Sequence, residues 1–129
     1  MPEHKHLINS LKYIYHMDIQ FIRQLCLSLP LATEDIKWEN NLCFMVYEKI
    51  FLMVSLDEIP TRASVKVPKE TFIDISSQDN FKQAAYLAKG QWVTIDDISQ
   101  LSKEESLHYV QQSFDLIKSK LSKKLQNAL

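Results

Sequence analysis

Glycine and cysteine are scarce in this chain of 129 residues, which contains one glycine, Gly90, and two cysteines. The Walker and dinucleotide-binding loops need several glycines, because the backbone there must approach phosphate closely. The sequence therefore contains neither loop. Two cysteines are too few for a disulfide framework. Cys26 and Cys43 both lie in apolar periodic segments, so we expect two reduced thiols in the core.

Long apolar runs and an excess of basic charge are also missing. The longest apolar runs are strand-like pieces such as residues 50–54, well below the roughly 18 residues of a membrane-spanning helix. The N-terminus lacks the features of a signal peptide, so we expect a cytoplasmic protein with no membrane partner. The net charge is −1, although residues 101–129 carry five basic and three acidic side chains. We expect these extra basic side chains to lie in water at the C-terminal end of a helix.

The residues that could carry chemistry form no recognisable constellation. A zinc site needs about four ligands close together. In contrast, His4 and His6 lie near the N-terminus, and His16 is far along the chain from His108. Cys26 lies on the buried stripe of a predicted helix. The acidic pairs Asp57-Glu58 and Asp96-Asp97 lie in predicted loops, where acidic side chains often cap or end helices and strands. We therefore expect no enzymatic activity, no cofactor and no metal ion.

Amphipathic helices are predicted near both ends of the chain. Apolar residues recur at steps of three and four over residues 7–16 and again over residues 18–29, where Pro30 ends the pattern. The apolar residues of both segments would fall on the same face of one continuous helix, so a single kinked helix is an alternative to two helices. At the other end, Ser102 and Glu105 have the spacing of a capping box, which predicts the start of a long last helix.

Two hairpins are predicted between these helices. Residues 42–47 and 50–55 flank Glu48-Lys49, a poor turn pair that allows a slightly longer loop. Residues 84–88 and 91–95 flank Lys89-Gly90, which is a stronger signal because glycine tolerates the positive φ of a tight turn.

The remaining segments complete an α+β arrangement. Apolar and polar side chains alternate over residues 63–67, which predicts a third strand. Pro68 predicts the start of a short helix. Residues 31–41 are expected to be an irregular link. No long crossover joins successive strands. The order predicts a two-layer α/β sandwich, in which an antiparallel sheet has helices on one face.

Four groups of residues resemble the MmcQ/YjbR family. They are Leu25-Cys-Leu-Ser-Leu-Pro30 with Ala32-Thr-Glu34, Val54-Ser-Leu-Asp-Glu-Ile-Pro60 with Ser64-Val-Lys66, Tyr86-Leu-Ala-Lys-Gly-Gln-Trp-Val93, and Ser113-Phe-Asp-Leu-Ile117 with Leu121-Ser-Lys-Lys124. These groups occur in the family's order and span about residues 18–125. The sequence departs from the family's pattern in three places. It has an additional segment before Met17, and it has Leu31 and Glu48-Lys49 at two places where the family has glycine.

The resemblance implies a fold similar to the CyaY-like (frataxin-like) and secretion-chaperone-like sandwiches. It also implies a single domain over residues 18–129, preceded by a helical extension over residues 1–17. Family members have been proposed to bind DNA through paired hairpin wings. No catalytic activity or cofactor is established for the family, so the resemblance implies no catalytic residues.

Strand alternation predicts a binding surface on the side of the sheet without helices. If Val93 and Ile95 face the helices, Trp92 and Thr94 face away from them, and Lys66 and Ser64 likewise point away. The candidate nucleic-acid or ligand surface consists of Trp38, Lys49, Lys66, Tyr86, Lys89 and Trp92. Aromatic faces beside lysines can stack bases and bind phosphate. They can equally form a dry layer beneath a loop.

Three kinds of partner follow from this surface. The first is DNA, bound weakly and with strong salt dependence, because few lysines face many acids. The second is a protein partner or a second copy, docked on the open sheet face or the N-terminal helix. Exposed apolar residues at Met45, Phe51 and Met53 would favour it. The third is a small molecule near Trp38, Tyr86 and Trp92. The sequence does not predict the oligomeric state.

Overall fold

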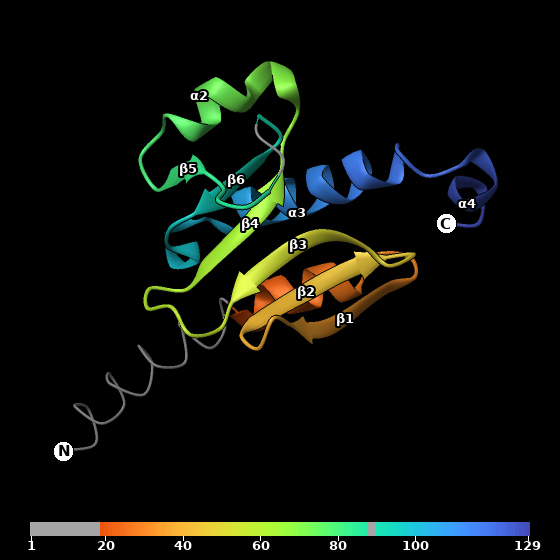
Figure 1. Ribbon diagram of the computed structural model, residues 1–129, viewed down its shortest axis with the longest axis horizontal. Coiled ribbons are helices and arrows are strands. Elements are labelled where there is room, and N and C mark those ends of the chain that lie inside the picture. The colour runs from red at the N-terminus through yellow and green to blue at the C-terminus, as the bar shows by residue number, and fades with distance from the viewer. Residues whose placement is uncertain (1–18, 88–89) are drawn as a thin grey trace.

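A computed structural model of the chain describes residues 19–87 and 90–129 (Figure 1). The predicted N-terminal extension, residues 1–17, and Lys89 therefore lie outside the described residues. Residues 19–27 form the first described helix. The later elements are β1 (Ala32–Lys37), β2 (Asn41–Val46), β3 (Lys49–Ser55), β4 (Arg62–Lys66), η1 (Lys69–Thr71), α2 (Phe72–Ser76), β5 (Phe81–Gln83), β6 (Trp92–Ile95), η2 (Ile98–Gln100), α3 (Lys103–Lys118) and α4 (Lys123–Asn127).

The described strands form one open antiparallel sheet with the order β1-β2-β3-β4-β6-β5. Helix 19–27 and α3 lie on the same side of this sheet, behind the strands in Figure 1. This arrangement confirms the predicted α+β class and the antiparallel sheet with helices packed on it. No helix of the described part of the chain is long and apolar enough to cross a membrane.

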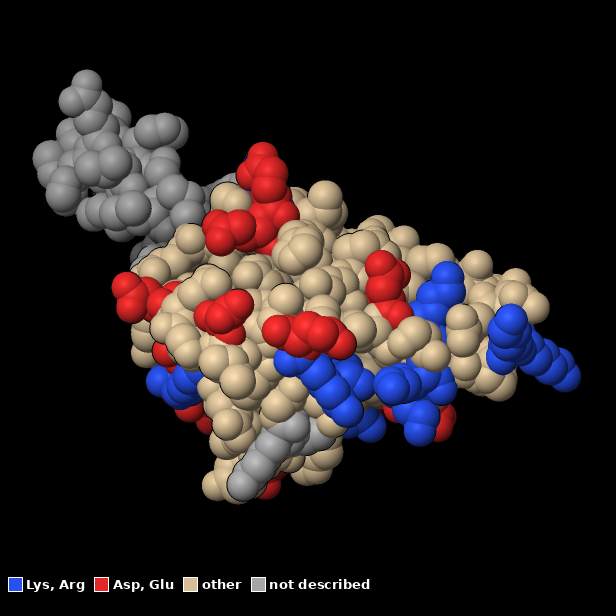
Figure 2. All heavy atoms as spheres, turned by 90° about the horizontal axis from the view of Figure 1, so that it is seen from above, with Lys and Arg blue, Asp and Glu red and all other residues tan. Residues whose placement is uncertain are grey.

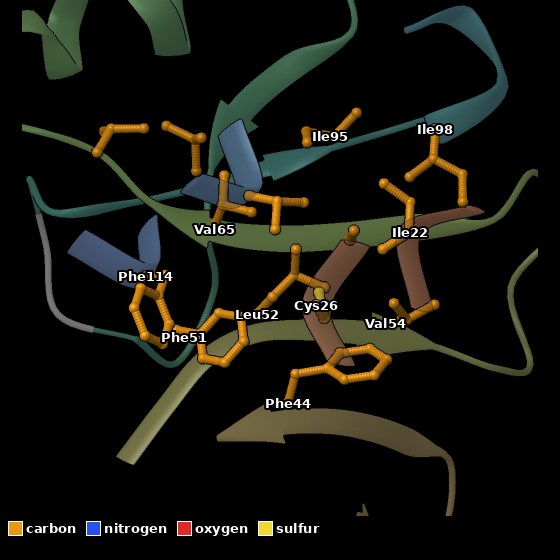
Figure 3. Packing of buried hydrophobic residues seen from close by; sticks show 14 of the residues in the cluster. Ile22, Cys26, Phe44, Phe51, Leu52, Val54, Val65, Ile95, Ile98 and Phe114 are labelled. Atoms are coloured by element: carbon orange, nitrogen blue, oxygen red, sulfur yellow. The ribbon is translucent and has the colours of Figure 1, made fainter. Parts of the chain in front are cut away.

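The core lies between the sheet and these helices (Figure 3). Phe44, Leu52, Val65 and Val93 are cross-strand partners on successive strands, and all four are at most 1% exposed. The helices contribute Ile22, Cys26, Val110 and Phe114 to the same cluster. Burying a side chain of this size stabilises the fold by about 1.5–3 kcal/mol. The opposite face of the sheet is thereby left without a helical layer.

The first predicted hairpin is present, with its turn one residue earlier than Glu48-Lys49. Tyr47 and Glu48 form the turn with φ values of 47° and 63°, and Lys49 opens β3. Two consecutive positive φ values match the right-handed twist of a hairpin, although each costs a non-glycine residue about 1–2 kcal/mol. The register shifts after Phe44, so Phe51 is the extra residue of a bulge.

The prediction of an irregular link over residues 31–41 was wrong, because Ala32–Lys37 forms the edge strand β1. The polar run Thr33-Glu34-Asp35 lacks the apolar alternation of a half-buried strand. An edge strand has only one neighbour and is commonly protected by charged side chains, so polar composition is compatible with pairing there.

The second predicted hairpin is shorter than expected. Its first strand was predicted over residues 84–88, but the strand is β5, Phe81–Gln83, and residues 85–87 form a turn. The amide of Ala84 donates to the carbonyl of Trp92 (3.1 Å), after which the chain leaves the sheet. Tyr86 has φ 63°, which is incompatible with a strand. Tyr86 therefore lies in a turn, and strand alternation does not determine the side of the sheet to which it points.

The helix-start signals agree with the structure. The amide of Glu105 donates to Ser102 Oγ, and the amide of Ser102 donates to Glu105 Oε1, both at 3.0 Å. This reciprocal pair is the predicted capping box of α3. Pro68 precedes the short helical segment η1–α2. Residues 76–80 end that segment, as the sequence indicates.

Candidate functional site

A hollow of about 600 Å³ opens on the sheet face opposite the helices. Met53, Ser64, Thr94 and Lys82 line it as cross-strand partners on β3, β4, β6 and β5. A second row, Asn41, Ser55 and Arg62, adds to the lining from β2, β3 and β4. Because side chains alternate along a strand, both rows point away from the helix-covered core.

Two exposed aromatic residues also line this hollow. Trp38 lies in the β1–β2 turn and is 67% exposed, and Tyr86 lies in the β5–β6 connection and is fully exposed. Both have positive φ, 49° and 63°. This conformation costs about 1–2 kcal/mol in a residue that is not glycine, and neither side chain recovers that cost by burial. The structure thus brings together two of the predicted surface residues.

The hydroxyls of Ser64 and Thr94 meet between β4 and β6. Ser64 Oγ and Thr94 Oγ1 are 3.0 Å apart, a hydrogen-bond distance. One hydroxyl donates to the other, so the hydrogen of the accepting hydroxyl remains available to a third group. Both residues line the hollow. They therefore offer donor and acceptor capacity to anything bound there.

The charged groups around the hollow offset one another. Asp96 Oδ1 lies 3.2 Å from Lys82 Nζ and 3.9 Å from Arg62 Nε. Arg62 and Lys82 line the hollow, as does Glu58. Two cations and two carboxylates therefore give no net formal charge. The hollow is polar, but it does not concentrate anions by its overall field.

The other predicted surface residues lie elsewhere. Trp92 is only 8% exposed and does not line the hollow, so it is a packed residue rather than an open platform. Its cross-strand partner Lys66 is half-buried. Lys49 is exposed at the first hairpin, away from the residues that line the hollow. The predicted surface is thus divided, and Lys89 lies outside the described residues.

Lys66 belongs to a group of lysines, which we call the lysine cluster: Lys66, Lys69 and Lys120. Burial lowers the pKa of Lys66, and the positive charges of Lys120 and Lys69 lower it further. The ion pairs of the described residues involve Arg23, Arg62 and Lys82, and none involves the lysine cluster. Figure 2 shows Lys and Arg side chains gathered toward the side of the molecule that carries α4.

The apolar patch expected for a protein partner is not present as predicted. Phe51 is fully buried, and Met45 is 7% exposed. The bulge in β3 lets the ring of Phe51 pack edge-on against Phe114, with ring centroids 5.3 Å apart. Of the three residues named for that patch, Met53 alone lines the hollow.

Sequence reasoning missed several polar residues of the hollow, among them Arg62, Lys82 and Asn41. Arg62 shares the alternation of Ser64 and Lys66, so extending the predicted strand by one residue would have found it. Lys82 was missed because β5 was predicted too late in the chain. Asn41 was missed because the strand was predicted to begin at residue 42.

Both thiols are buried, and neither lines the hollow. Burial raises the pKa of the Cys26 thiol strongly, because the apolar core disfavours the thiolate. Cys43 is also fully buried, and burial raises the pKa of its thiol. Within residues 19–87 and 90–129, no three His, Cys, Asp or Glu side chains come together as a metal site.

Comparison with solved structures supports the fold. A Deinococcus radiodurans protein with the domain DUF419 superposes with a TM-score of 0.77 at 21% identity, covering 84% of this chain and 85% of that one. A Pseudomonas syringae protein gives a TM-score of 0.63 at 19% identity, covering 75% and 95%. A comparison with curated proteins found no match to the sequence. The YjbR family model matches residues 27–116, most of the chain. The protein therefore belongs to the YjbR family.

Proposed function

We propose that this protein binds nucleic acid without catalysing a reaction, and that the lysine cluster contacts the phosphate backbone. The unpaired state of these lysines carries the proposal, because among the described residues none of Lys66, Lys69 and Lys120 belongs to an ion pair. Burial lowers the pKa of Lys66, and the positive charges of Lys120 and Lys69 lower it further, so the three ammonium groups repel one another. Phosphate oxygens placed among the three side chains would relieve this repulsion, since each ammonium donates charge-assisted hydrogen bonds.

The position of the lysine cluster suits an extended strand. Lys66 follows Ser64 on the same face of β4, so it lies next to the rows that line the hollow. Lys69 is exposed in η1, and Lys120 is exposed just after α3. Lys123 and Lys124, both exposed in α4, continue the basic surface toward the C-terminus.

The first hairpin is a weaker candidate for phosphate contact. Its exposed end carries Glu48 and Lys49 side by side, and their charges offset each other. We therefore assign the phosphate contacts to the lysine cluster rather than to this hairpin.

The expected affinity is low and depends on salt. Each phosphate neutralised on a duplex changes log K by about −0.9 per unit of log salt. Three lysines would give a slope of about −2.7, which corresponds to about a forty-fold loss between about 50 and 200 mM salt. The net charge of −1 adds no long-range attraction.

The test is fluorescence polarisation of labelled duplex and single-stranded oligonucleotides at about 50 and 200 mM salt. Saturable binding is expected at the lower salt concentration. The double variant Lys69→Gln/Lys120→Gln should lower the salt slope by about 2. The control is Lys103→Gln, which removes an exposed lysine from the opposite end of α3 and should bind like the unaltered protein. Absence of saturable binding at low salt, or equal binding by the double variant, would exclude the proposal.

A further inference from the structure

The hollow on the open sheet face has the features of a second site with a different ligand. We infer that it binds a flat, uncharged heteroaromatic ring of the nucleobase type, which stacks on Trp38 and hydrogen-bonds to the polar floor. This inference does not depend on the lysine cluster. A free nucleoside and an unpaired base within a strand share this chemistry, and the experiment below separates them.

The size of the hollow fits a small ligand. Its volume of about 600 Å³ is in the range of roughly 300–1,000 Å³ that is usual for small-molecule sites. Its floor is made of paired strands, so the polar groups there are fixed before binding. A rigid floor with a few polar groups is what orients a ligand in such sites.

Folding does not explain the exposure of the two aromatic side chains. Trp38 and Tyr86 are large and exposed, and each lies in a connection between strands. The positive φ of Trp38 belongs to the tight β1–β2 turn, where Glu39 also has φ 69°, so the exposed rings rather than the backbone point to a ligand. Both line the same hollow, although they are 48 positions apart in the sequence. A planar ring stacked on one of them would cover apolar surface that is otherwise in water.

The polar groups of the floor match the edge of a heteroaromatic ring. The Ser64–Thr94 hydroxyl pair has a hydrogen to donate, and the amide of Asn41 offers both a donor and an acceptor. Arg62 Nε is buried beside Asp96 Oδ1, 3.9 Å away, and is not reached from the hollow. Arg62 nevertheless lines the hollow, and its guanidinium carries four further N–H donors for a ring nitrogen or carbonyl oxygen.

The charge of the hollow favours an uncharged ligand. Glu58 and Asp96 offset Arg62 and Lys82, so an added phosphate gains no net Coulombic attraction. Binding in the hollow should therefore depend weakly on salt. Binding at the lysine cluster should depend on it strongly, and this contrast distinguishes the two sites.

The experiment is a titration of the full ¹⁵N-labelled chain with adenosine, guanosine, cytidine and uridine, followed through the two tryptophan indole N–H resonances. At least one nucleoside should shift the Trp38 resonance saturably and leave that of Trp92 nearly unchanged, because Trp92 is buried outside the hollow. The corresponding nucleoside monophosphate should bind within about threefold of the nucleoside, since the charges around the hollow cancel. Ribose 5-phosphate should give no shift.

Variants locate the site. Trp38→Ala should weaken nucleoside binding about tenfold, by loss of stacking. Because this variant lacks the Trp38 resonance, its binding is followed through the backbone amide resonance of Thr94. Thr94→Val removes the hydroxyl at nearly constant volume and should also weaken nucleoside binding. The matched control is Lys69→Gln/Lys120→Gln, which should bind nucleoside like the unaltered protein even if it no longer binds strands.

A second arm uses a single-stranded oligonucleotide at high salt, where phosphate contacts are screened. A Trp38 shift with the strand but with no nucleoside would identify an unpaired base as the source of the ring. A shift with nucleosides but not with the strand would identify a free small molecule. The inference is overturned if neither shifts Trp38, or if a monophosphate binds far better than its nucleoside and loses that binding with salt.

Discussion

The hydroxyl of Ser113 in α3 donates a hydrogen bond to the backbone carbonyl of Phe51 in β3. The same oxygen accepts a hydrogen bond from the backbone amide of Lys66 in β4, at 2.8 Å. Strands β3 and β4 pair as far as Leu52 and Val65. Beyond that pair the two strands separate, so Phe51 and Lys66 are not paired with each other. One buried helix side chain therefore satisfies a backbone group of each strand where they separate.

Replacing Ser113 with alanine should destabilise the fold. The change leaves a buried carbonyl and a buried amide without a partner, and each such group costs about 1–3 kcal/mol. Urea denaturation should show a lower midpoint with an unchanged m-value. The control is Ser119→Ala, which removes an exposed hydroxyl bonded to the Leu116 carbonyl in the same helix. Equal midpoints for the two variants would contradict the bridging role of Ser113.

Lys66→Gln should leave the fold at least as stable as the unaltered protein at neutral pH. The pKa of Lys66 is lowered in the folded state, so the folded protein disfavours its positive charge. That unfavourable contribution is present while Lys66 is protonated and disappears as the pH rises above its folded-state pKa. Burial is the larger cause and repulsion by Lys120 and Lys69 the smaller one. Thermal denaturation at low and high salt checks this, because salt screens the repulsion but not the cost of burial, so part of the gain should persist at high salt. A large loss of stability would mean that Lys66 has a favourable partner instead.

Glu34 should make stability depend on pH. Its carboxylate accepts hydrogen bonds from Arg23 Nε at 2.8 and 3.0 Å, and this contact lowers the pKa of Glu34. A lowered folded-state pKa contributes stability above the ordinary glutamate value and loses it as the pH falls through the folded-state value. The stability difference between Glu34→Gln and the unaltered protein should therefore be present at pH 7 and vanish in acid, below about pH 4. A difference independent of pH would contradict this account.

The two thiols should be unreactive until the protein unfolds. Cys26 and Cys43 are both fully buried, and burial raises the pKa of each. Nucleophilic thiols react as thiolates, so Ellman's reagent at about pH 8 should label neither cysteine quickly in the native protein. Two thiols per chain should react in denaturant. Rapid labelling of one native cysteine would show that local opening exposes it.

Much of the fold follows from local sequence features. The Ser102–Glu105 box places the start of α3, the apolar alternation of residues 63–67 predicts β4, and the apolar block around Glu48 predicts the first hairpin. These signals are local, because a cap or a strand period involves residues close together in the chain. The family resemblance also rests on local motifs, and the match over residues 27–116 confirms it.

The candidate sites needed the tertiary structure. Alternation correctly placed Trp92 and Thr94 on one face of β6, but it did not indicate that Trp92 is buried. Burial depends on which loops and helices cover a residue. The edge strand β1 was missed for a related reason, since its polar residues pair only because β2 lies beside them.

By itself, the sequence determined the class of the fold, its helix caps, its family and the absence of known phosphate-binding loops, because each of these depends on neighbours in the chain. Only the tertiary structure decided that Trp38 and Tyr86 line one hollow and that Lys66 lies near Lys120. Sheet order and register bring such distant residues together, and both result from packing the whole sheet against its helices.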